Sequence, residues 1–189
     1  MKKRKINDFR LIGKEFYLRP IQPKDINKTY LSWMNDKSIT QYLYQTKRKY
    51  TLNDLKNYCK SVDYNKKMVF AIISKKNDEH IGNMTLNPID IDNKKTGLGG
   101  IIGNKKYWGT NAFTESMNLL IDYAFNIRKF IKIESGVLEN NVPSIIATKK
   151  VGFKLEGIRK KHVIINNKSI DSYLFGIVNN NNEKYHERN

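Results

Sequence analysis

The stretch directly ahead of a long helical repeat contains Gly103-Asn104-Lys105-Lys106-Tyr107-Trp108-Gly109-Thr110-Asn111-Ala112. The first turn of a helix leaves backbone N–H groups without partners, and these point, with the positive end of the helix dipole, at an anion docked there. Gly109 permits unusual backbone angles and close approach, while Lys105 and Lys106 add positive charge. A pyrophosphate fits this turn, although a glycine before a helix is on its own more often only a cap.

A second informative segment reads Asn140-Asn141-Val142-Pro143-Ser144-Ile145-Ile146-Ala147-Thr148-Lys149-Lys150-Val151-Gly152-Phe153, followed by Glu156-Gly157. Asn141 and Ser144 flank a proline at the start of a short apolar run, where such residues commonly cap a helix. Glu156 lies in a later segment of strand character, and its carboxylate has the chemistry of a general base or of an amine-binding group.

Together the two segments resemble the GNAT superfamily of N-acetyltransferases, and most closely its ribosomal-protein N-terminal acetyltransferase branch. That branch reads roughly Gly-x-Gly-x-x-x-Glu-Ala at the long helix, and this chain has Gly109-Thr110-Asn111-Ala112-Phe113-Thr114-Glu115-Ser116. Downstream, the Asn-x-x-Ser, Lys-x-Gly-Phe and Glu-Gly patterns of the branch align with Asn141, Ser144, Lys150, Gly152, Phe153, Glu156 and Gly157. The likeness extends over roughly residues 15 to 178.

The resemblance implies that a neutral amine attacks the thioester of acetyl-CoA directly, through a tetrahedral oxyanion, and that CoA thiolate leaves. It implies that the cofactor phosphates bind at Lys106, Tyr107, Trp108, Gly109, Thr110, Asn111 and Ala112. Backbone N–H groups of a splayed strand at Gly100, Ile101 and Ile102 would face the pantetheine and the thioester oxygen. Asn141 and Ser144 would also contact the cofactor, and Ser144 would give the thiolate a proton. For the base, Glu156 and an ordered water remain alternatives.

Two positions depart from the family pattern. The second glycine of the pyrophosphate turn is Asn111, which tolerates fewer backbone angles, so weaker cofactor affinity is expected. The tyrosine that many members place on the last helix as a proton donor is replaced by Thr148. These departures keep open a second interpretation, a CoA-binding protein without catalytic activity.

The elements that must position these residues follow from periodicity and turn signals. The pattern predicts a strand at 16–19, a helix at 24–34, and a helix after Thr51 that begins with a Thr51–Asp54 capping box. Three meander strands (68–74, 80–86, 96–102), a helix at 111–126, a strand at 131–138, a helix at 143–150 and two strands joined by Asn166-Asn167 follow. Glycines in the third meander strand favour a bulge there. The resemblance implies an α/β (α+β) GNAT fold, with a mixed, mostly antiparallel sheet, a splayed central strand and flanking helices.

The chain has 189 residues, which predicts one domain, and the resemblance implies a GNAT domain over 1–178; the polar residues 179–189 are expected to form a frayed tail. No segment has the ~20 apolar residues of a membrane span, and the basic start lacks the apolar run of an export signal. The single cysteine, Cys59, looks like a core residue and fits a reducing compartment, so we expect a cytoplasmic, bacterial protein without a metal site.

The net charge of +17 concentrates anionic partners. Dispersed lysines account for most of it, so a basic nucleic-acid-binding module is the less favoured alternative. The charge disfavours a polyamine acceptor and favours one that carries phosphate, such as a nucleotide-linked amino sugar, whereas the resemblance favours a protein N-terminus. The acceptor is thus a small-molecule or peptide amine, and the resemblance makes a homodimer the expected assembly.

Overall fold

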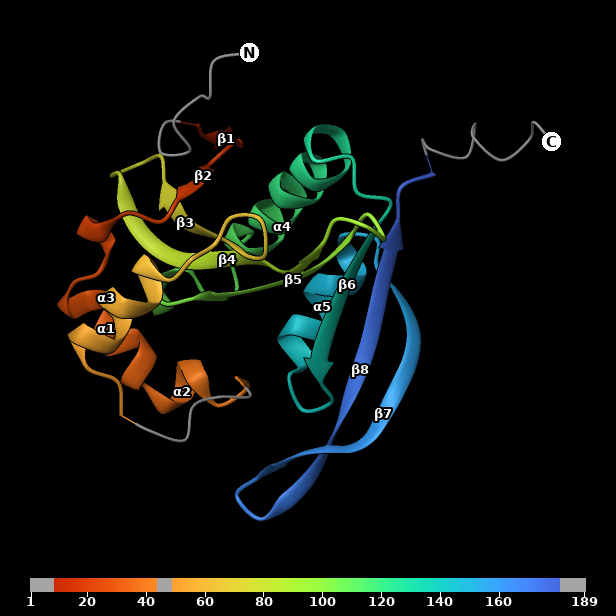
Figure 1. The fold of residues 1–189 in the computed structure, drawn as a ribbon. Coiled ribbons are helices and arrows are strands. Elements are labelled where there is room, and N and C mark those ends of the chain that lie inside the picture. Colours follow the sequence, from red (N-terminus) through yellow and green to blue (C-terminus); the bar gives the residue numbers. More distant parts are fainter. Residues whose placement is uncertain (1–8, 44–48, 181–189) are drawn as a thin grey trace.

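A computed structural model describes residues 9–43 and 49–180 (Figure 1). Eight strands form one sheet in the order β1-β2-β3-β4-β5-β6-β8-β7, antiparallel except where β5 and β6 run parallel. The strands are β1 (Leu11–Ile12), β2 (Phe16–Pro20), β3 (Met68–Ser74), β4 (Glu79–Asp90), β5 (Lys95–Ile102), β6 (Lys132–Leu138), β7 (Lys154–Ile165) and β8 (Lys168–Val178). The predicted mixed, mostly antiparallel α/β fold is confirmed.

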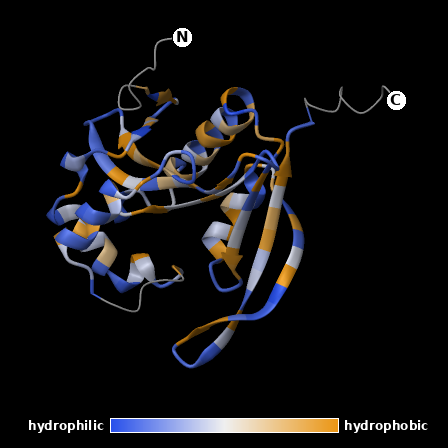
Figure 2. Cartoon of the chain, in the orientation of Figure 1, coloured by the Kyte–Doolittle hydropathy of each residue, from blue (hydrophilic) through white to orange (hydrophobic). Residues whose placement is uncertain are grey.

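Helices cover both faces of this sheet. The helices α1 (Lys28–Asn35), α2 (Lys37–Thr40) and α3 (Leu52–Lys60) pack on one face through a small core that includes Trp33, Leu55 and Val69. Helix α4 (Ala112–Asp122) packs on the other face and continues into the π-helical turn η4 (Tyr123–Ile127). Its apolar and polar bands alternate, as expected of a helix buried on one side (Figure 2). Helix α5 (Val142–Lys150) follows β6.

The N-terminal helical region is more broken than its sequence pattern predicts. The expected helix over 24–34 is divided into a 3₁₀ turn, η2 (Pro23–Asp25), and α1. The division falls at Asn27, whose side-chain oxygen accepts a hydrogen bond from the N–H of Tyr30 (3.0 Å) and so caps α1. The short α2 and β1 were not predicted, because neither is long enough to show a period.

The local turn and cap signals are confirmed. The N–H of Asp54 donates to the Thr51 hydroxyl (3.1 Å) while the N–H of Thr51 donates to the Asp54 carboxylate (2.8 Å), which completes the predicted capping box of α3. Asn166 and Asn167 have φ values of +48° and +62° in the turn between β7 and β8. Cys59 is half-buried against the small core.

The predicted bulge lies on the neighbouring strand. The β4–β5 register shifts between Leu86 and Ile89 of β4, and Gly97 of β5 faces this irregularity. A Cβ atom at Gly97 would lie 2.2 Å from the Asn87 carbonyl oxygen, so the glycine is needed for close approach.

The ends of the described chain bear on two further expectations. The N–H of Asn179 donates to Ile131 O (2.9 Å), so ordered structure continues into the first residue of the predicted tail, and residues 181–189 lie outside the described part. No helix among the described residues is long and apolar enough to cross a membrane.

Candidate active site

A large cleft, of about 1290 Å³, lies where β5 and β6 separate. These strands pair only between 95–97 of β5 and 132–134 of β6, and beyond this short ladder they diverge (Figure 1). Both diverging segments line the cleft, together with the first turn of α4, one side of α5, and residues from α1, α2 and α3. The cleft therefore joins the three regions that sequence reasoning assigns to chemistry.

Backbone groups of β5 face into this separation. The N–H of Gly103 donates to Ile81 O of β4 (2.8 Å), which fixes the direction of alternate residues along the strand. The backbone N–H and C=O groups of Ile101 therefore point toward β4, where its registered partner is Asn83. Those of Gly100 and Ile102 point the other way, toward the gap. The indole nitrogen of Trp108 donates to Ile102 O (2.9 Å), which confirms that direction. The N–H groups of Gly100 and Ile102 thus have no strand partner on the side of the cleft.

The turn before α4 presents a second set of unpaired backbone donors. Within the described residues, the N–H groups of Gly109, Asn111, Phe113 and Thr114 donate to no other group, whereas the N–H of Ala112 donates to the Thr110 hydroxyl (3.2 Å). Gly109 has φ +74°, and a Cβ added there would meet nothing within 4 Å. The glycine is therefore required by the backbone conformation, and the space in front of the turn is open.

Several side chains hold this turn in place. Lys105 forms an ion pair with Asp36 (2.6 Å) beside α1 and α2, and this contact, together with hydrogen bonds from Ser38, lowers the pKa of the Asp36 carboxyl to about 2. The Glu79 carboxylate accepts hydrogen bonds from Asn104 (2.7 Å) and from the Tyr107 hydroxyl (3.2 Å). Lys105 is thus engaged by a carboxylate, while the backbone of the turn stays available to a ligand.

Asn111, which stands in place of a glycine, is conformationally ordinary. Its φ of −76° and ψ of 0° lie in the right-handed helical region, where an asparagine carries no strain. Its side chain donates to Glu15 (3.2 Å) and Glu115 (3.2 Å). Glu115 also accepts from the N–H groups of Glu15 and Phe16, so it anchors the start of β2 to α4.

Of the residues predicted to bind the cofactor, most line the cleft: Gly100, Ile101, Ile102, Tyr107, Trp108, Gly109, Thr110, Asn111, Asn141 and Ser144. Two do not. Lys106 is exposed on η3 (Lys105–Tyr107), and Ala112 is fully buried in the core.

Helix α5 begins at the cleft. The Asn141 side-chain oxygen accepts from the N–H of Ser144 (3.3 Å), so Asn141 is the N-cap. The Ser144 hydroxyl makes no hydrogen bond within the described residues and belongs to the cleft wall. Thr148, one turn further along, also lines the wall and is 1% exposed. The geometry therefore assigns the cap to Asn141 and leaves the Ser144 hydroxyl available to a ligand.

Glu156 is not brought to the cleft. It lies on β7, where its carboxylate pairs with Lys132 of β6 (2.8 Å) and covers the backbone of Gly176. The hydrogen bond to Glu156 raises the pKa of Lys132. The sequence cannot show which face of β7 this residue occupies, and the structure gives its carboxylate a partner away from the proposed chemistry.

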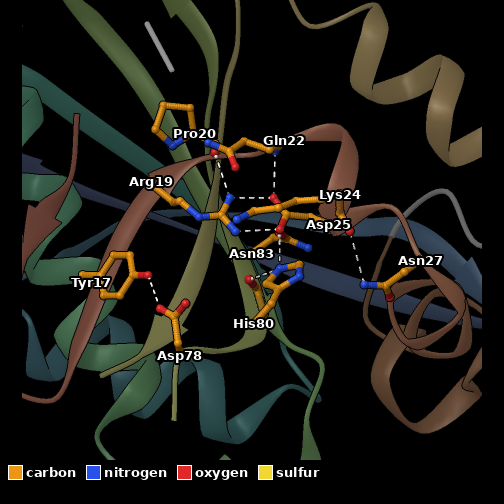
Figure 3. Close-up of polar contacts among 11 residues, drawn as sticks. Tyr17, Arg19, Pro20, Gln22, Lys24, Asp25, Asn27, Asp78, His80 and Asn83 are labelled. Atoms are coloured by element: carbon orange, nitrogen blue, oxygen red, sulfur yellow. Dashed lines mark hydrogen bonds and ion pairs between the residues drawn. The ribbon is translucent and has the colours of Figure 1, made fainter. Parts of the chain in front are cut away.

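A polar group beneath the cleft was missed by sequence reasoning. On β4, His80 and Asn83 lie beside the buried ion pair of Arg19 and Asp25 (Figure 3), whose guanidinium and carboxylate are 2.6 Å apart. Burial alone raises the pKa of Asp25, but hydrogen bonds from Arg19 and from the N–H of Gln22 lower it overall. Burial lowers the pKa of His80, against the opposing charge of Asp25. The sequence carries little signal for this group, because His80 and Asn83 are two of several polar residues in β4.

The wall under α1 to α3 is aromatic and poor in carboxylates. It includes Tyr30, Met34, Tyr42, Tyr50 and Tyr58. Within the described ranges, Asp54 is the one Asp or Glu that lines the cleft, and its carboxylate is occupied by the capping box. No cluster of three or more metal-ligating side chains occurs among the described residues.

Comparison with known proteins agrees with this geometry. A family model described as an acetyltransferase (GNAT) domain matches residues 15–154. The match covers most of the chain, including the strand gap, the α4 turn and α5, and the chain belongs to this family.

Its relatives include N-acetyltransferases of bacteria. The chain is 29% identical over 180 residues to the probable N-acetyltransferase YjcK of Bacillus subtilis, with 92% of this chain and 99% of that protein covered. Among solved structures, a ribosomal-protein-S5-alanine acetyltransferase from Vibrio fischeri has a TM-score of 0.79 at 20% identity, covering 92% of this chain and 98% of that one. A spermidine N-acetyltransferase from Vibrio cholerae, in complex with CoA and spermine, has a TM-score of 0.79 at 22% identity, covering 87% and 95%. These structural likenesses show the fold.

The protein is therefore an acyltransferase that uses acetyl-CoA. The residues present fit this cofactor, because unpaired N–H groups occur both at the α4 turn and along the open edge of β5 within one cleft. The interpretation as a basic nucleic-acid-binding module loses its support.

Proposed function

We propose that this protein acetylates the α-amine of a peptide or protein N-terminus whose first residues are uncharged. The observation that carries the proposal is one continuous cleft, with backbone donors for acetyl-CoA on one side and an aromatic, carboxylate-poor wall on the other. Acetyl-CoA supplies an activated acetyl thioester. Binding, orientation and the proton given to the leaving thiolate are assigned to residues of the chain.

The backbone of two elements would hold the cofactor. The N–H groups at Gly109, Asn111, Phe113 and Thr114, at the positive end of the α4 dipole, suit the pyrophosphate. The N–H groups of Gly100 and Ile102 suit the pantetheine amides and the acetyl oxygen, where negative charge develops as the amine attacks. Because these donors are fixed by β4 and by the contacts of the α4 turn, little reorganisation is needed during the reaction.

Proton transfer would use Ser144 on the leaving side. Its hydroxyl lines the cleft and makes no hydrogen bond within the described chain, so it can donate to the departing thiolate. Glu156 is not part of this proposal, because its carboxylate pairs with Lys132 outside the cleft. We assign removal of the amine proton to an ordered water, the alternative that needs no side-chain base.

The side chains of the wall under α1 to α3, where we place the acceptor, suit three classes of acceptor amine unequally. A polyamine carries several positive charges and would need several carboxylates, whereas the described wall offers only the occupied Asp54. A nucleotide-linked amino sugar needs cations for its phosphates, and the described lining offers two lysines, Lys67 over the Tyr58 ring (4.3 Å) and Lys150 on α5. An uncharged peptide needs neither, and tyrosines suit its apolar side chains.

The test is a panel of acceptors with purified protein and acetyl-CoA. Free CoA release would be followed with short N-terminal peptides, spermidine and a nucleotide-linked amino sugar, and acetyl-CoA binding would be measured separately by thermal stabilisation. We expect the highest kcat/KM with peptides. Turnover of spermidine or of the sugar nucleotide above that of every peptide would reject the proposed acceptor, and binding without turnover of any amine would favour a catalytically inactive protein.

We also propose a cytoplasmic homodimer. Cys59 is the single cysteine of the chain and cannot form an internal disulfide, which suits a reducing compartment. Strand β7 forms one edge of the sheet and exposes Leu155, Ile158 and Ile164, apolar side chains that a second copy could cover. A mass measured in solution that equals one chain at micromolar concentration would reject the dimer.

A further inference from the structure

The Asn83 side chain contains a buried donor without a partner. Among the residues that the structure describes, its amide nitrogen, Nδ2, is the one buried side-chain nitrogen or oxygen that makes no hydrogen bond. The residue is 5% exposed and lines the cleft. Buried polar groups are nearly always hydrogen-bonded, so one without a partner calls for an explanation.

The neighbouring histidine fixes the orientation of this amide. His80 Nε2 lies 2.9 Å from Gly82 O, and a carbonyl oxygen only accepts, so Nε2 carries a hydrogen. The same nitrogen lies 3.1 Å from Asn83 and must face an acceptor there, which is Oδ1 (Figure 3). The amide nitrogen therefore points away from His80. His80 itself is held against the ring of Trp33, with 5.1 Å between ring centroids.

Asn83 is close to the proposed reacting atoms. It is registered opposite Ile101 on β5, and directly opposed residues of antiparallel strands have Cα atoms about 5 Å apart. Ile101 lies between Gly100 and Ile102, whose N–H groups face the strand gap. An amine that attacks an acetyl group held there must approach from the cleft, along the wall to which Asn83 belongs.

We propose that the Asn83 amide donates a hydrogen bond to an oxygen of the acyl acceptor, namely the carbonyl oxygen next to the reacting amine, and thereby selects α-amino carbonyl acceptors. This inference rests on the proposed function and assigns a residue to its specificity. Nδ2 is almost completely covered, so an acceptor oxygen reaches it only when the Asn83 amide turns toward the cleft that the residue lines. The χ2 torsion of asparagine is soft, so this turn is available, and it moves Oδ1 away from His80 as it brings Nδ2 to the acceptor.

The test compares two peptides that differ at one bond. The first is an ordinary short peptide, and the second has its first peptide bond replaced by an (E)-alkene, which keeps the shape but removes the carbonyl oxygen. We measure kcat/KM for each with the native protein, Asn83→Asp and Asn83→Ala. The native enzyme is expected to prefer the ordinary peptide about tenfold, the effect of one hydrogen bond that a buried donor would otherwise lack. With kcat/KM expressed per neutral amine, because the allylic amine of the alkene is the more basic, this ratio falls to about one in both variants, while the KM for acetyl-CoA is unchanged.

Thr85→Val is the matched control. Thr85 lines the same wall two residues along β4, but its hydroxyl already donates to Gly99 O (3.3 Å), so the variant leaves the ratio at its native value whatever its effect on rate. A variant ratio that stays near tenfold would overturn the role of Asn83. A native enzyme that acetylates other amines but neither peptide would instead overturn the proposed acceptor, and the inference with it.

Discussion

From the sequence, Ser144 could cap helix α5 or donate a proton to the thiolate, and its hydrogen bonds distinguish these two roles. Its backbone N–H, not its hydroxyl, binds the Asn141 cap, so removing the hydroxyl leaves the helix start intact. Ser144→Ala should lower kcat by about 10² while the melting temperature changes little, since the loss of a general acid costs at least that factor.

Steady-state kinetics and thermal unfolding of the same preparations check this. Ser135→Ala, a change at another cleft-lining serine on β6, is the control and should have a much smaller effect on kcat. If Ser144→Ala retains kcat within twofold, another group or water protonates the thiolate.

The buried His80 imidazole should make the free energy of unfolding depend on pH. Its burial lowers the pKa of the imidazole below the ordinary 6.5, so the unfolded chain takes up a proton at a higher pH than the folded chain does. The free energy of unfolding should therefore fall as the pH drops below about 6.5, by at most about 1.4 kcal/mol per pH unit for one proton, until the folded pKa is reached.

Denaturant titrations from pH 7.5 to 5 would show this slope. It should be reduced in His80→Gln and retained in His162→Gln, a change at an exposed position of β7. Equal slopes in the native protein and His80→Gln would mean that His80 is not the titrating group.

At the scale of elements, the start of α5 combines a cap with the proposed contact to pantetheine. Asn141→Asp keeps an oxygen for the N–H of Ser144 but removes the amide donor, so stability should be retained while the KM for acetyl-CoA rises several-fold. Asn141→Ala should lose both, with about 1 kcal/mol of stability. Isothermal titration with CoA and thermal unfolding distinguish the two roles, and unchanged CoA affinity in Asn141→Asp would restrict Asn141 to capping.

Some elements were predictable because their signals are local. β3 has the bounds 68–74 expected from an unbroken apolar run, and Thr51–Asp54 and Asn166-Asn167 form the cap and turn that their residue types favour. The extension of β4 past Pro88 was not predictable, because a proline argues against a strand unless a bulge accommodates it.

The candidate site was predictable in its backbone and less so in its side chains. The N–H groups that we propose for the cofactor belong to a glycine turn before a helix and to a glycine-rich strand, and the order of the sequence places both. The roles of Glu156 and Asn83 depend on which face of their strand meets the cleft and on which side chains pack against that face. Residues far apart in the chain decide both, since His80 orients Asn83 while Lys132 pairs with Glu156.

At the scale of the whole molecule, the net charge of +17 should act on cofactor capture. Acetyl-CoA carries several negative charges, and a positive field raises its local concentration in a way that salt screens over about 10 Å at 0.1 M. The KM for acetyl-CoA should rise several-fold between 50 and 300 mM KCl, with a smaller change in kcat. A KM that is independent of salt would show that only the local backbone donors matter.

The short ladder between β5 and β6 has a consequence for motion. Strand pairing joins the two halves of the sheet only at 95–97 of β5 and 132–134 of β6. This short ladder can therefore act as a hinge about which each half moves slightly. A pantetheine chain that bonds to the open edge of β5 would complete the ladder in place of a missing strand. Hydrogen–deuterium exchange of the Gly100 and Ile102 amides should therefore slow sharply when CoA binds, and the protein would be most rigid when loaded.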